Sequence, residues 1–315
     1  MTGPPTETID VILAATHPHP GLAESLDRFA AEAEPLGRVV LVTPTSEKGV
    51  RYRFARQIIS DRGRLVPELW RDGLIATGAP LVAFSTTQMI PRSGWLADLT
   101  STLHESGAAG VGGPIGPGPG LSATGRAVAL LRYSGYFPPP PEGRRVLPPG
   151  ENALYRRDRL AEVESSWSDG FWEVEVQRAL IARGHRLAMS RSAVVGFEGG
   201  TGLASMARQR FAHARRYGRF RSSGVGIGRR LLRATSAPLV PPLLIARIAG
   251  ALRGRGMAPG PWVAALPALT ALASAWAVGE AWGTLEIEDG CRPIAARSKE
   301  RGGSPAARAR ARVHH

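Results

Sequence analysis

Residues 81–96 read LVAFSTTQMIPRSGWL, a short apolar run followed by polar residues and then by a new apolar segment. The run 81–84 has the continuity and length of a strand that is covered on both faces. It ends at the polar stretch 85–88, and a helix is predicted over 93–105. A strand, a polar connection and a helix in this order are typical of one unit of an α/β fold.

The same alternation continues on both sides of this stretch. Further strands are predicted at 11–15, 38–42, 109–112, 151–155 and 187–197. Further helices are predicted at 22–33, 68–77, 157–163 and 172–183. Strands that alternate with helices favour a mostly parallel, Rossmann-like sheet that is flanked by helices.

Ligands of such sheets bind beyond the carboxyl ends of the strands. The first strand ends near Thr16 and the second near Thr43. The strand at 81–84 ends near Thr86, and Gln88 follows two residues later. We therefore expect these four side chains to line a ligand-binding edge.

Charge is unevenly distributed along the 315 residues. The chain has 40 Lys and Arg against 26 Asp and Glu, a formal net charge of +14. No Asp or Glu occurs between Glu198 and Glu280, a stretch that is rich in arginine. The block is interpreted either as a solvated basic surface or as a surface for phosphates of lipid headgroups or of a nucleotide. Nucleic acid is not an expected partner, because few aromatic residues interrupt the block. The single cysteine, Cys291, excludes an intrachain disulfide.

The C-terminal third changes in composition. Residues 260–279 carry no charge and are about long enough to cross a bilayer, although Pro267 interrupts them. Arginines flank this stretch on both sides, which favours peripheral, re-entrant or hairpin attachment at the cytoplasmic face of the cell membrane over a single span. The alternative is that these helices pack on the rest of the protein. We predict three regions: an α/β domain at 1–225, a membrane-associated helical region at 226–285 and a disordered basic tail at 286–315.

The order of several motifs resembles the family 2 glycosyltransferases, which have the nucleotide-sugar transferase fold called GT-A. The resemblance covers about residues 9 to 220, and no single motif decides it. It is carried by the strands at 11–16 and 39–42, by LVAF at 81–84 with IPRSGWL at 90–96, by ENALYRR at 151–157, by WEVEV at 172–176 and by RQRF at 208–211 with YGR at 217–219. The resemblance implies a nucleotide-sugar donor.

The chain departs from the family pattern where the family binds metal. Family members carry an Asp after the second strand, where this chain has Thr43 or Pro44. An Asp-x-Asp triplet normally holds a divalent metal on the diphosphate, and Thr86-Thr87-Gln88 takes its place here. Phe197 is nearest to a metal-contacting His of the family. Since hard cations need anionic oxygen ligands, no metal ligand is assigned, although the family implies a divalent metal.

One carboxylate matches the position of the family's general base. Glu173 aligns with that residue, and Glu175 follows two residues later. Two residues that are two apart at a helix start point in different directions, so only one of them is expected to be catalytic. In an inverting transfer the base takes the proton of the acceptor hydroxyl as its oxygen attacks the anomeric carbon. The alternative role for both carboxylates is to stabilise the first turn of a helix.

A leaving diphosphate without a metal needs another positive partner. Arg208 and Arg210 are candidates, because they follow the last predicted strand and a guanidinium binds phosphate with two parallel hydrogen bonds. Alternatively, they belong to the basic surface described above.

The resemblance therefore implies a glycosyltransferase that moves a sugar from a nucleotide-sugar to a lipid-linked or cell-envelope glycan acceptor, with Glu173 as base. The donor would contact Thr16, Thr43, Thr86, Gln88, Arg208 and Arg210. The alternative is a catalytically inactive GT-A-like protein that binds a nucleotide or serves as a scaffold. The missing acidic triplet favours this second hypothesis, and the Glu173 segment favours the first.

Overall fold

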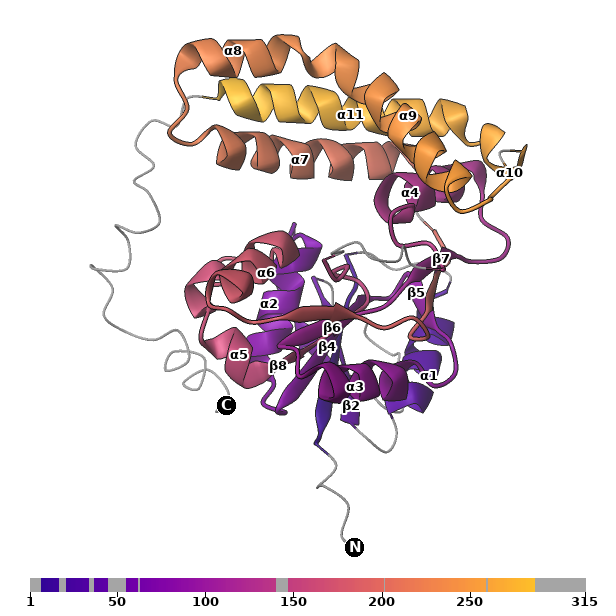
Figure 1. Ribbon diagram of the computed structural model, residues 1–315, viewed down its shortest axis with the longest axis vertical. Helices are drawn as coiled ribbons and strands as arrows, with labels where there is room; N and C mark the ends of the chain where they lie inside the picture. The colour runs from indigo at the N-terminus through magenta and orange to yellow at the C-terminus, as the bar shows by residue number, and fades with distance from the viewer. Residues whose placement is uncertain are drawn as a thin grey trace, which may run out of the picture. The chain divides into compact units, whose positions relative to one another are not determined.

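The computed structural model describes residues 7–16, 21–33, 37–44, 55–61, 63–139, 147–200, 202–258 and 260–286. The described chain forms two compact units (Figure 1). Unit 1 contains the residues up to Gly125 together with Arg132–Gly200. Unit 2 contains Arg126–Leu131 and the residues from 202 onward. Each unit is described by itself.

Unit 1 is built on a seven-stranded sheet with the strand order β3-β2-β1-β4-β8-β6-β9. Strands β3, β2, β1 and β4 are parallel, whereas β8 is antiparallel to both of its neighbours. The last strand, β9, runs parallel to β6. The strands are β1 (Ile9–Ala14), β2 (Gly37–Thr43), β3 (Ala55–Ile59), β4 (Leu81–Thr86), β6 (Gly110–Gly112), β8 (Ala153–Arg156) and β9 (Leu187–Met189).

The central strands are apolar because helices cover both faces of the sheet. All residues of β1 and β4 are buried. One face packs against α2, α5 and α6, and their residues Leu69, Trp70, Val176 and Leu180 share a core with the strands. The other face is covered by α1 and α3, where Phe29 and Trp95 meet with ring centroids 5.2 Å apart. The helices are α1 (Leu22–Ala33), α2 (Val66–Ala76), α3 (Trp95–Ser106), α4 (Ala123–Tyr133), α5 (Arg157–Ala161) and α6 (Glu173–Ala182), with a 3₁₀ turn η1 (Glu164–Ser166).

A second sheet of three short strands continues from the carboxyl end of β4. Its order is β5-β10-β7, formed by β5 (Met89–Pro91), β10 (Val195–Phe197) and β7 (Ile115–Pro117). Asn152 ties this region to the main sheet, since its amide nitrogen donates to the carbonyl oxygens of Pro114 and Ala193. Its amide oxygen accepts from the ring N–H of Trp95. These three bonds leave Asn152 fully buried without an unpaired group.

The prediction of an α/β, mostly parallel sheet is confirmed, and the differences lie in short elements. The predicted strand 187–197 is in fact two strands, β9 and β10, which belong to different sheets. A bend between them, where Ala193 N–H bonds the hydroxyl of Ser190, turns the chain from one sheet to the other. The sequence analysis also missed β3, which is a mixed polar and apolar edge strand, and α4, whose start follows a glycine-rich loop.

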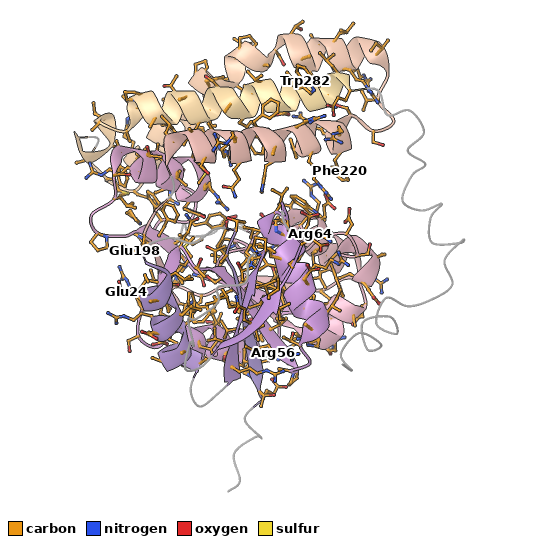
Figure 2. All side chains as sticks on the ribbon, turned by 180° about the vertical axis from the view of Figure 1, so that it is seen from behind. Glu24, Arg56, Arg64, Glu198, Phe220 and Trp282 are labelled. Carbon is orange, nitrogen blue, oxygen red and sulfur yellow. The ribbon has the colours of Figure 1, made fainter. Side chains whose placement is uncertain are left out.

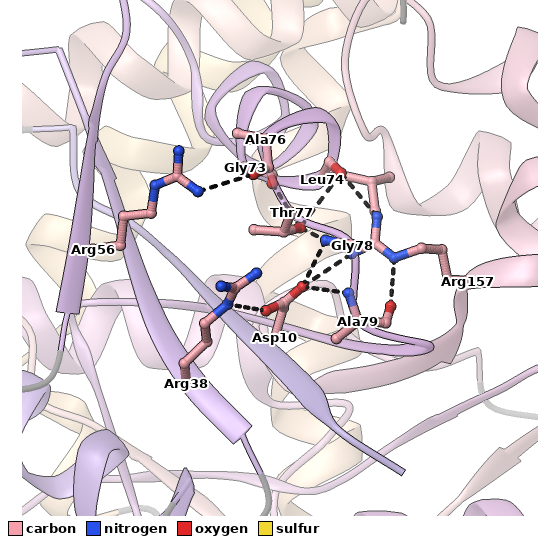
Figure 3. A network of polar contacts seen from close by, with 10 residues as sticks. All are labelled: Asp10, Arg38, Arg56, Gly73, Leu74, Ala76, Thr77, Gly78, Ala79 and Arg157. Carbon is pink, nitrogen blue, oxygen red and sulfur yellow. Dashed lines mark hydrogen bonds and ion pairs between the residues drawn. The ribbon is translucent and has the colours of Figure 1, made fainter. Parts of the chain in front are cut away.

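A buried carboxylate at the amino-terminal edge of the sheet connects several segments (Figure 3). Asp10 of β1 is 1% exposed and accepts hydrogen bonds from the backbone N–H groups of Gly78 and Ala79. Arg38 of β2 lies 2.7 Å from its Oδ1, and Arg157 of α5 lies 3.4 Å from its Oδ2. One side chain thus connects β1, β2, the connection before β4 and α5.

Unit 2 is a layer of helices. It contains α7 (Leu203–Ser222), α8 (Ile227–Thr235), the 3₁₀ turn η2 (Ala237–Leu239), α9 (Val240–Arg253), α10 (Gly260–Val263) and α11 (Leu266–Leu285). Helix α11 lies between α7 on one side and α8 with α9 on the other (Figure 1). Helices α7 and α11 approach closely because Gly218 and Gly283 face the partner backbone. A Cβ on Gly283 would collide with the carbonyl oxygen of Arg215, and one on Gly218 with that of Glu280.

The predicted boundary between residues 225 and 226 stays a prediction. In the described chain, α7 belongs to unit 2, and its small residues pack against α11. The structure revises one expectation for the C-terminal third. Pro267 does not interrupt an apolar helix, because it lies in the first turn of α11, where no backbone donor is needed. The predicted tail at 286–315 lies outside the described residues apart from Glu286, as does Cys291.

One helical segment among the described residues has the length and composition of a membrane span. It is Ile227–Arg253, which includes α8, η2 and α9, with a mean hydropathy of 1.4 in its most apolar window. The uncharged stretch 260–279, which the sequence suggested, comprises α10 and most of α11. It buries Leu269, Leu272 and Ala273 inside unit 2, whereas Val263, Leu266 and Val278 are exposed.

Candidate functional site

The three predicted threonines lie at neighbouring positions on the carboxyl edge of the sheet. Thr43 ends β2 and Thr86 ends β4, while Thr16 follows β1 between them. The register pairs Ala14 with Thr86, and the N–H of Ala15 bonds the carbonyl oxygen of Val42. The edge that parallel α/β sheets use for ligands is therefore lined by hydroxyl groups here.

The hydroxyl of Thr86 is the polar group of this edge that the protein itself leaves unsatisfied. Thr86 is 5% exposed, and its Oγ1 has no hydrogen-bond partner among the described residues. A buried hydroxyl without a partner costs free energy, so it indicates a position where a ligand or water supplies the missing bond.

Gln88, the last residue of the triplet, is held by the loop after β10. Its amide nitrogen donates to the carbonyl oxygen of Gly199 at 2.9 Å. The backbone of the same residue accepts from the N–H of Glu198 at 2.9 Å. Gln88 therefore links the end of β4 to the end of β10.

Glu173 is connected to the end of β4 through Gly150 and Trp70. Glu173 is the first residue of α6. A Cβ built on Gly150 would lie 3.3 Å from its carboxyl carbon and 2.9 Å from the ring of Trp70. That ring donates its N–H to the carbonyl oxygen of Ser85, the residue before Thr86, at 2.7 Å. Gly150 thus leaves the space in which the Glu173 carboxyl lies.

The surroundings of Glu173 favour its protonated form. Burial raises the pKa of its carboxyl, and this effect exceeds the opposing effects of its own backbone N–H and of Arg132. The N-terminus of α6 acts in the same direction as Arg132, since a helix start favours negative charge. A carboxylate with a raised pKa beside a ligand edge has the property that a general base needs near neutral pH.

A buried ion pair adjoins Glu173, and the sequence analysis did not find it. Glu151 is 6% exposed, and its Oε1 contacts the guanidinium of Arg132 and accepts from the hydroxyl of Tyr133. The hydroxyl of Ser85 donates to the backbone oxygen of Glu151 at 2.8 Å. Arg132 therefore interacts with two carboxylates, those of Glu151 and Glu173. The only available signal was a glutamate directly after a glycine, at the start of the strand predicted over 151–155.

The charge of Glu173 also affects the pKa values of two tyrosines. Burial and the Glu173 carboxylate together raise the pKa of Tyr136 to about 12. The same causes raise the pKa of Tyr155, although its bond from Gln177 at 2.7 Å opposes them. Both hydroxyls therefore stay protonated over the working range of an enzyme and are available as hydrogen-bond donors.

A second pair of carboxylates lies near the three-stranded sheet. Burial raises the pKa of Glu198, and the like charge of Glu24 on α1 raises it further. Figure 2 shows both residues on the same side of unit 1. Glu198 directly follows Phe197, the position that the sequence analysis compared with a metal-contacting His. It is the nearest carboxylate in sequence to that position, and the analysis overlooked it.

Arg208 and Arg210 belong to α7 in unit 2. Arg208 is exposed. The guanidinium of Arg210 stacks on the ring of Trp276, 4.2 Å from its centroid. One of the two predicted phosphate-binding arginines therefore packs on α11, and the role of both stays a prediction.

The triplet does not fit the divalent metal that the family pattern implies. Thr86 and Thr87 offer only neutral hydroxyls, and Gln88 offers only a neutral amide oxygen, since its amide nitrogen donates to Gly199. Hard divalent cations bind most strongly to carboxylate oxygens. In the part of the chain that the structure describes, no three His, Cys, Asp or Glu side chains gather at one place.

No family model matches the chain, and no curated protein matches it. Solved structures that are similar in fold include a mannosyltransferase from Pyrobaculum calidifontis in complex with GDP-Man and Mn2+, at 16% identity and a TM-score of 0.46, over 97% of this chain and 79% of that one. Glucosyl-3-phosphoglycerate synthase from Mycobacterium tuberculosis is similar at 17% identity and a TM-score of 0.44, over 66% of this chain and 78% of that one. TarS from S. aureus is similar at 14% identity and a TM-score of 0.41, over 60% of this chain and 59% of that one.

These likenesses concern the fold alone, and they carry no argument about donor or acceptor. The strand order and the antiparallel β8 are observed directly in this chain. Unit 1 thus has an α/β fold, with a mostly parallel sheet between two layers of helices.

Proposed function

We propose that the protein is a glycosyltransferase that moves a sugar from a nucleotide-sugar donor to a lipid-linked or cell-envelope acceptor, with inversion at the anomeric carbon. The observation that carries this proposal is the position of Glu173, whose carboxyl lies against Gly150, next to the Trp70 ring that bonds to the end of β4. The unsatisfied hydroxyl of Thr86 at the same strand end supports a ligand there.

In the proposed reaction the acceptor hydroxyl gives its proton to the Glu173 carboxylate. Its oxygen forms a bond to the anomeric carbon while the bond from that carbon to the diphosphate breaks, and the nucleoside diphosphate leaves with the electron pair. The hydroxyls of Thr16, Thr43 and Thr86 are proposed to bind the donor, and Gln88 positions the end of β4. Arg208 and Arg210 are proposed to balance the leaving charge.

The proposed location is the cytoplasmic face of a membrane, where a lipid-linked acceptor would be found. The apolar segment Ile227–Arg253 supports association with a membrane.

A second candidate function is binding without catalysis. The neutral triplet Thr86-Thr87-Gln88 favours it, because a transferase that uses a metal needs carboxylates at this place. Such a protein would bind a nucleotide or a partner at the same edge and would not turn it over.

Calorimetry with a panel of nucleotide-sugars, with and without Mn²⁺, tests both candidates, together with an assay for released nucleoside diphosphate. Glu173→Gln is compared with the matched variant Glu175→Gln in the same helical turn. Metal-independent binding, with turnover that is lost only in Glu173→Gln, is expected. Binding without turnover in the wild type would support the second candidate, and no binding to any nucleotide-sugar would contradict both.

A further inference from the structure

Helix α8 has its apolar side outward and its basic side inward. None of its residues is buried, and Ile227, Leu231 and Leu232 are 60%, 51% and 71% exposed. At 100° per residue these three side chains share one face of the helix. A helix of a soluble protein normally turns that face toward the core.

Two of the three arginines of α8, Arg230 and Arg233, bond to the rest of unit 2, whereas Arg229 is exposed. Arg230 donates to the carbonyl oxygens of Ser222 at 2.8 Å and of Val225 at 3.0 Å, and also to that of Glu286. Arg233 donates to the carbonyl oxygen of Arg221 at 2.9 Å. These bonds fix the rotation of α8, so the leucines cannot turn inward without breaking them.

The exposed apolar face continues beyond α8. Leu239 of η2 and Leu243 of α9 are 60% and 66% exposed, and only Ile248 and Leu252 of α9 are buried. We call the side chains of Ile227, Leu231, Leu232, Leu239 and Leu243 the outward face. Only 11% of the apolar window that spans α8 and α9 is buried.

Positive charge surrounds the outward face. Arg229, Arg247 and Arg253 are exposed on the same helices. From residue 199 to residue 279 the sequence contains no Asp or Glu. The outward face is therefore apolar and cationic, which matches an anionic phospholipid surface. The nearby carboxylates of Glu286 and Glu280 pair with Arg215 and Arg221 of α7.

A second copy of the chain fits this surface poorly. A two-fold contact would bring the arginines of both copies together, with no carboxylate on these helices to pair them. A helix that crosses the bilayer is also disfavoured. A span over the whole segment Ile227–Arg253 would place Arg229, Arg230 and Arg233 in hydrocarbon. A span over the part after Thr235 would still place Arg247 there, and each such residue near the centre costs about 2.5–3.5 kcal/mol.

We propose that the outward face of α8, η2 and α9 is a docking surface for an anionic phospholipid bilayer and that these helices lie in the plane of its headgroups. The proposal deepens the membrane location within the proposed function. It does not depend on the transfer reaction, because none of its residues is proposed to contact the donor or the acceptor.

The test is co-sedimentation of the full-length protein with vesicles of phosphatidylglycerol and phosphatidylcholine, compared with phosphatidylcholine alone. The double variant Leu231→Glu/Leu232→Glu is compared with Ile59→Glu, which changes a similarly exposed residue on β3. We expect the wild type and Ile59→Glu to bind the anionic vesicles and raised salt to weaken binding. We expect the double variant to bind at least about tenfold more weakly, because two apolar contacts become like charges of the lipid.

Several results would overturn this proposal. Three of them are binding results: equal binding to neutral and anionic vesicles, unchanged binding of the double variant, or no binding of the wild type. The fourth is protein that stays in the membrane after washing with alkaline carbonate, because a helix that spans the bilayer resists this washing. Dimers of the wild type that dissociate in the double variant on size exclusion would instead assign the surface to self-association.

Two controls separate this proposal from the enzymatic one. The double variant should keep the unfolding midpoint of the wild type, since both leucines are exposed, and it should keep its affinity for nucleotide-sugar. Glu173→Gln should bind vesicles as the wild type does. Failure of the vesicle experiment therefore leaves the transfer proposal intact, and the reverse holds as well.

Discussion

Single residues at the carboxyl edge of the sheet combine properties that oppose stability. Glu173 is a carboxylate in surroundings that favour its neutral form, and Thr86 is a buried hydroxyl without a partner among the described residues. Folding would be easier without either feature. Groups of this kind are typical of sites where function, rather than stability, selects the residue.

Glu173→Gln should stabilise the fold at neutral pH. Because burial raises the folded-state pKa of this carboxyl above its unfolded value, the protonated group fits the fold best. The contribution of the protonated carboxyl to the stability of the fold is fully present below its pKa in the unfolded chain, about 4.3. It is lost as pH rises through the pKa in the folded protein. Glutamine stays neutral at every pH. At pH above the folded-state pKa of Glu173, the variant should therefore gain about 1.4 kcal/mol of unfolding free energy for each unit by which folding raises that pKa. In acid the gain should be near zero.

Thermal unfolding of both proteins across this pH range measures the effect. Glu175→Gln is the control, because it removes the other carboxylate of the same helical turn. A Glu173→Gln variant that is less stable than the wild type at neutral pH would show that the carboxylate is instead stabilised by its neighbours.

Arg132 should set the pH at which Glu173 loses its proton. Since its charge lowers the pKa of that carboxyl, Arg132→Gln should move the acidic limb of the kcat/KM profile to higher pH, whereas Arg132→Lys should move it less. The same change leaves Glu151 buried without its cation, which costs about 3–5 kcal/mol. The double variant Arg132→Gln/Glu151→Gln removes that cost and should keep the shifted limb. An unchanged limb in a folded variant would assign Arg132 to the Glu151 pair alone.

At the scale of elements, the close contact of α7 with α11 depends on glycine. Gly283→Ala would place a methyl group against the backbone of Arg215, which cannot move without bending α7. We expect a loss of about 1–3 kcal/mol, as for other overpacked contacts. Gly250→Ala in α9 is the matched control, because a Cβ there meets open space. It should raise stability by about 0.5–1 kcal/mol.

Chemical denaturation that is followed by tryptophan fluorescence measures both variants, since Trp276 and Trp282 lie on α11. If Gly283→Ala and Gly250→Ala both raised the stability by a similar amount, α7 and α11 could move apart at little cost.

At the scale of the whole molecule, the two edges of the sheet in unit 1 have different roles. Asp10 ties four segments together at the amino edge, and the proposed site lies at the carboxyl edge. Asp10→Asn should leave Arg38 and the partly buried Arg157 without their anion and cost about 2–4 kcal/mol. Nucleotide-sugar affinity of the folded variant, measured by calorimetry, should equal that of the wild type. A weakened affinity would show that strain passes from one edge to the other.

The sequence predicted the central elements of unit 1 well because their signals are local. Strands β1, β2 and β4 are continuous apolar runs that end at polar residues, and the predicted helices differ from the observed ones by a few residues at their ends. The elements that it missed lack such signals. Strand β3 lies at the edge of the sheet, where polar side chains are tolerated, and its identity as a strand comes from pairing with β2.

The candidate site was predictable only in part. The position of Glu173 at a helix start and of the threonines at strand ends followed from the sequence pattern. The contacts of Arg132 with Glu151, and of Gln88 with the loop after β10, join residues that are 19 and 111 positions apart. No local pattern contains such pairs, because the fold alone brings them together.

By itself the sequence determined the α/β class, the ligand edge of the sheet and the excess of arginine in the C-terminal third, since each depends on apolar periodicity or composition. Only the tertiary structure decided which apolar helix is exposed. The uncharged stretch 260–279 buries part of its apolar side chains inside unit 2, whereas α8 turns its leucines outward because two of its arginines bond to backbone carbonyl oxygens of the same unit. Hydropathy measures how apolar a segment is, but burial depends on which face the neighbouring helices cover.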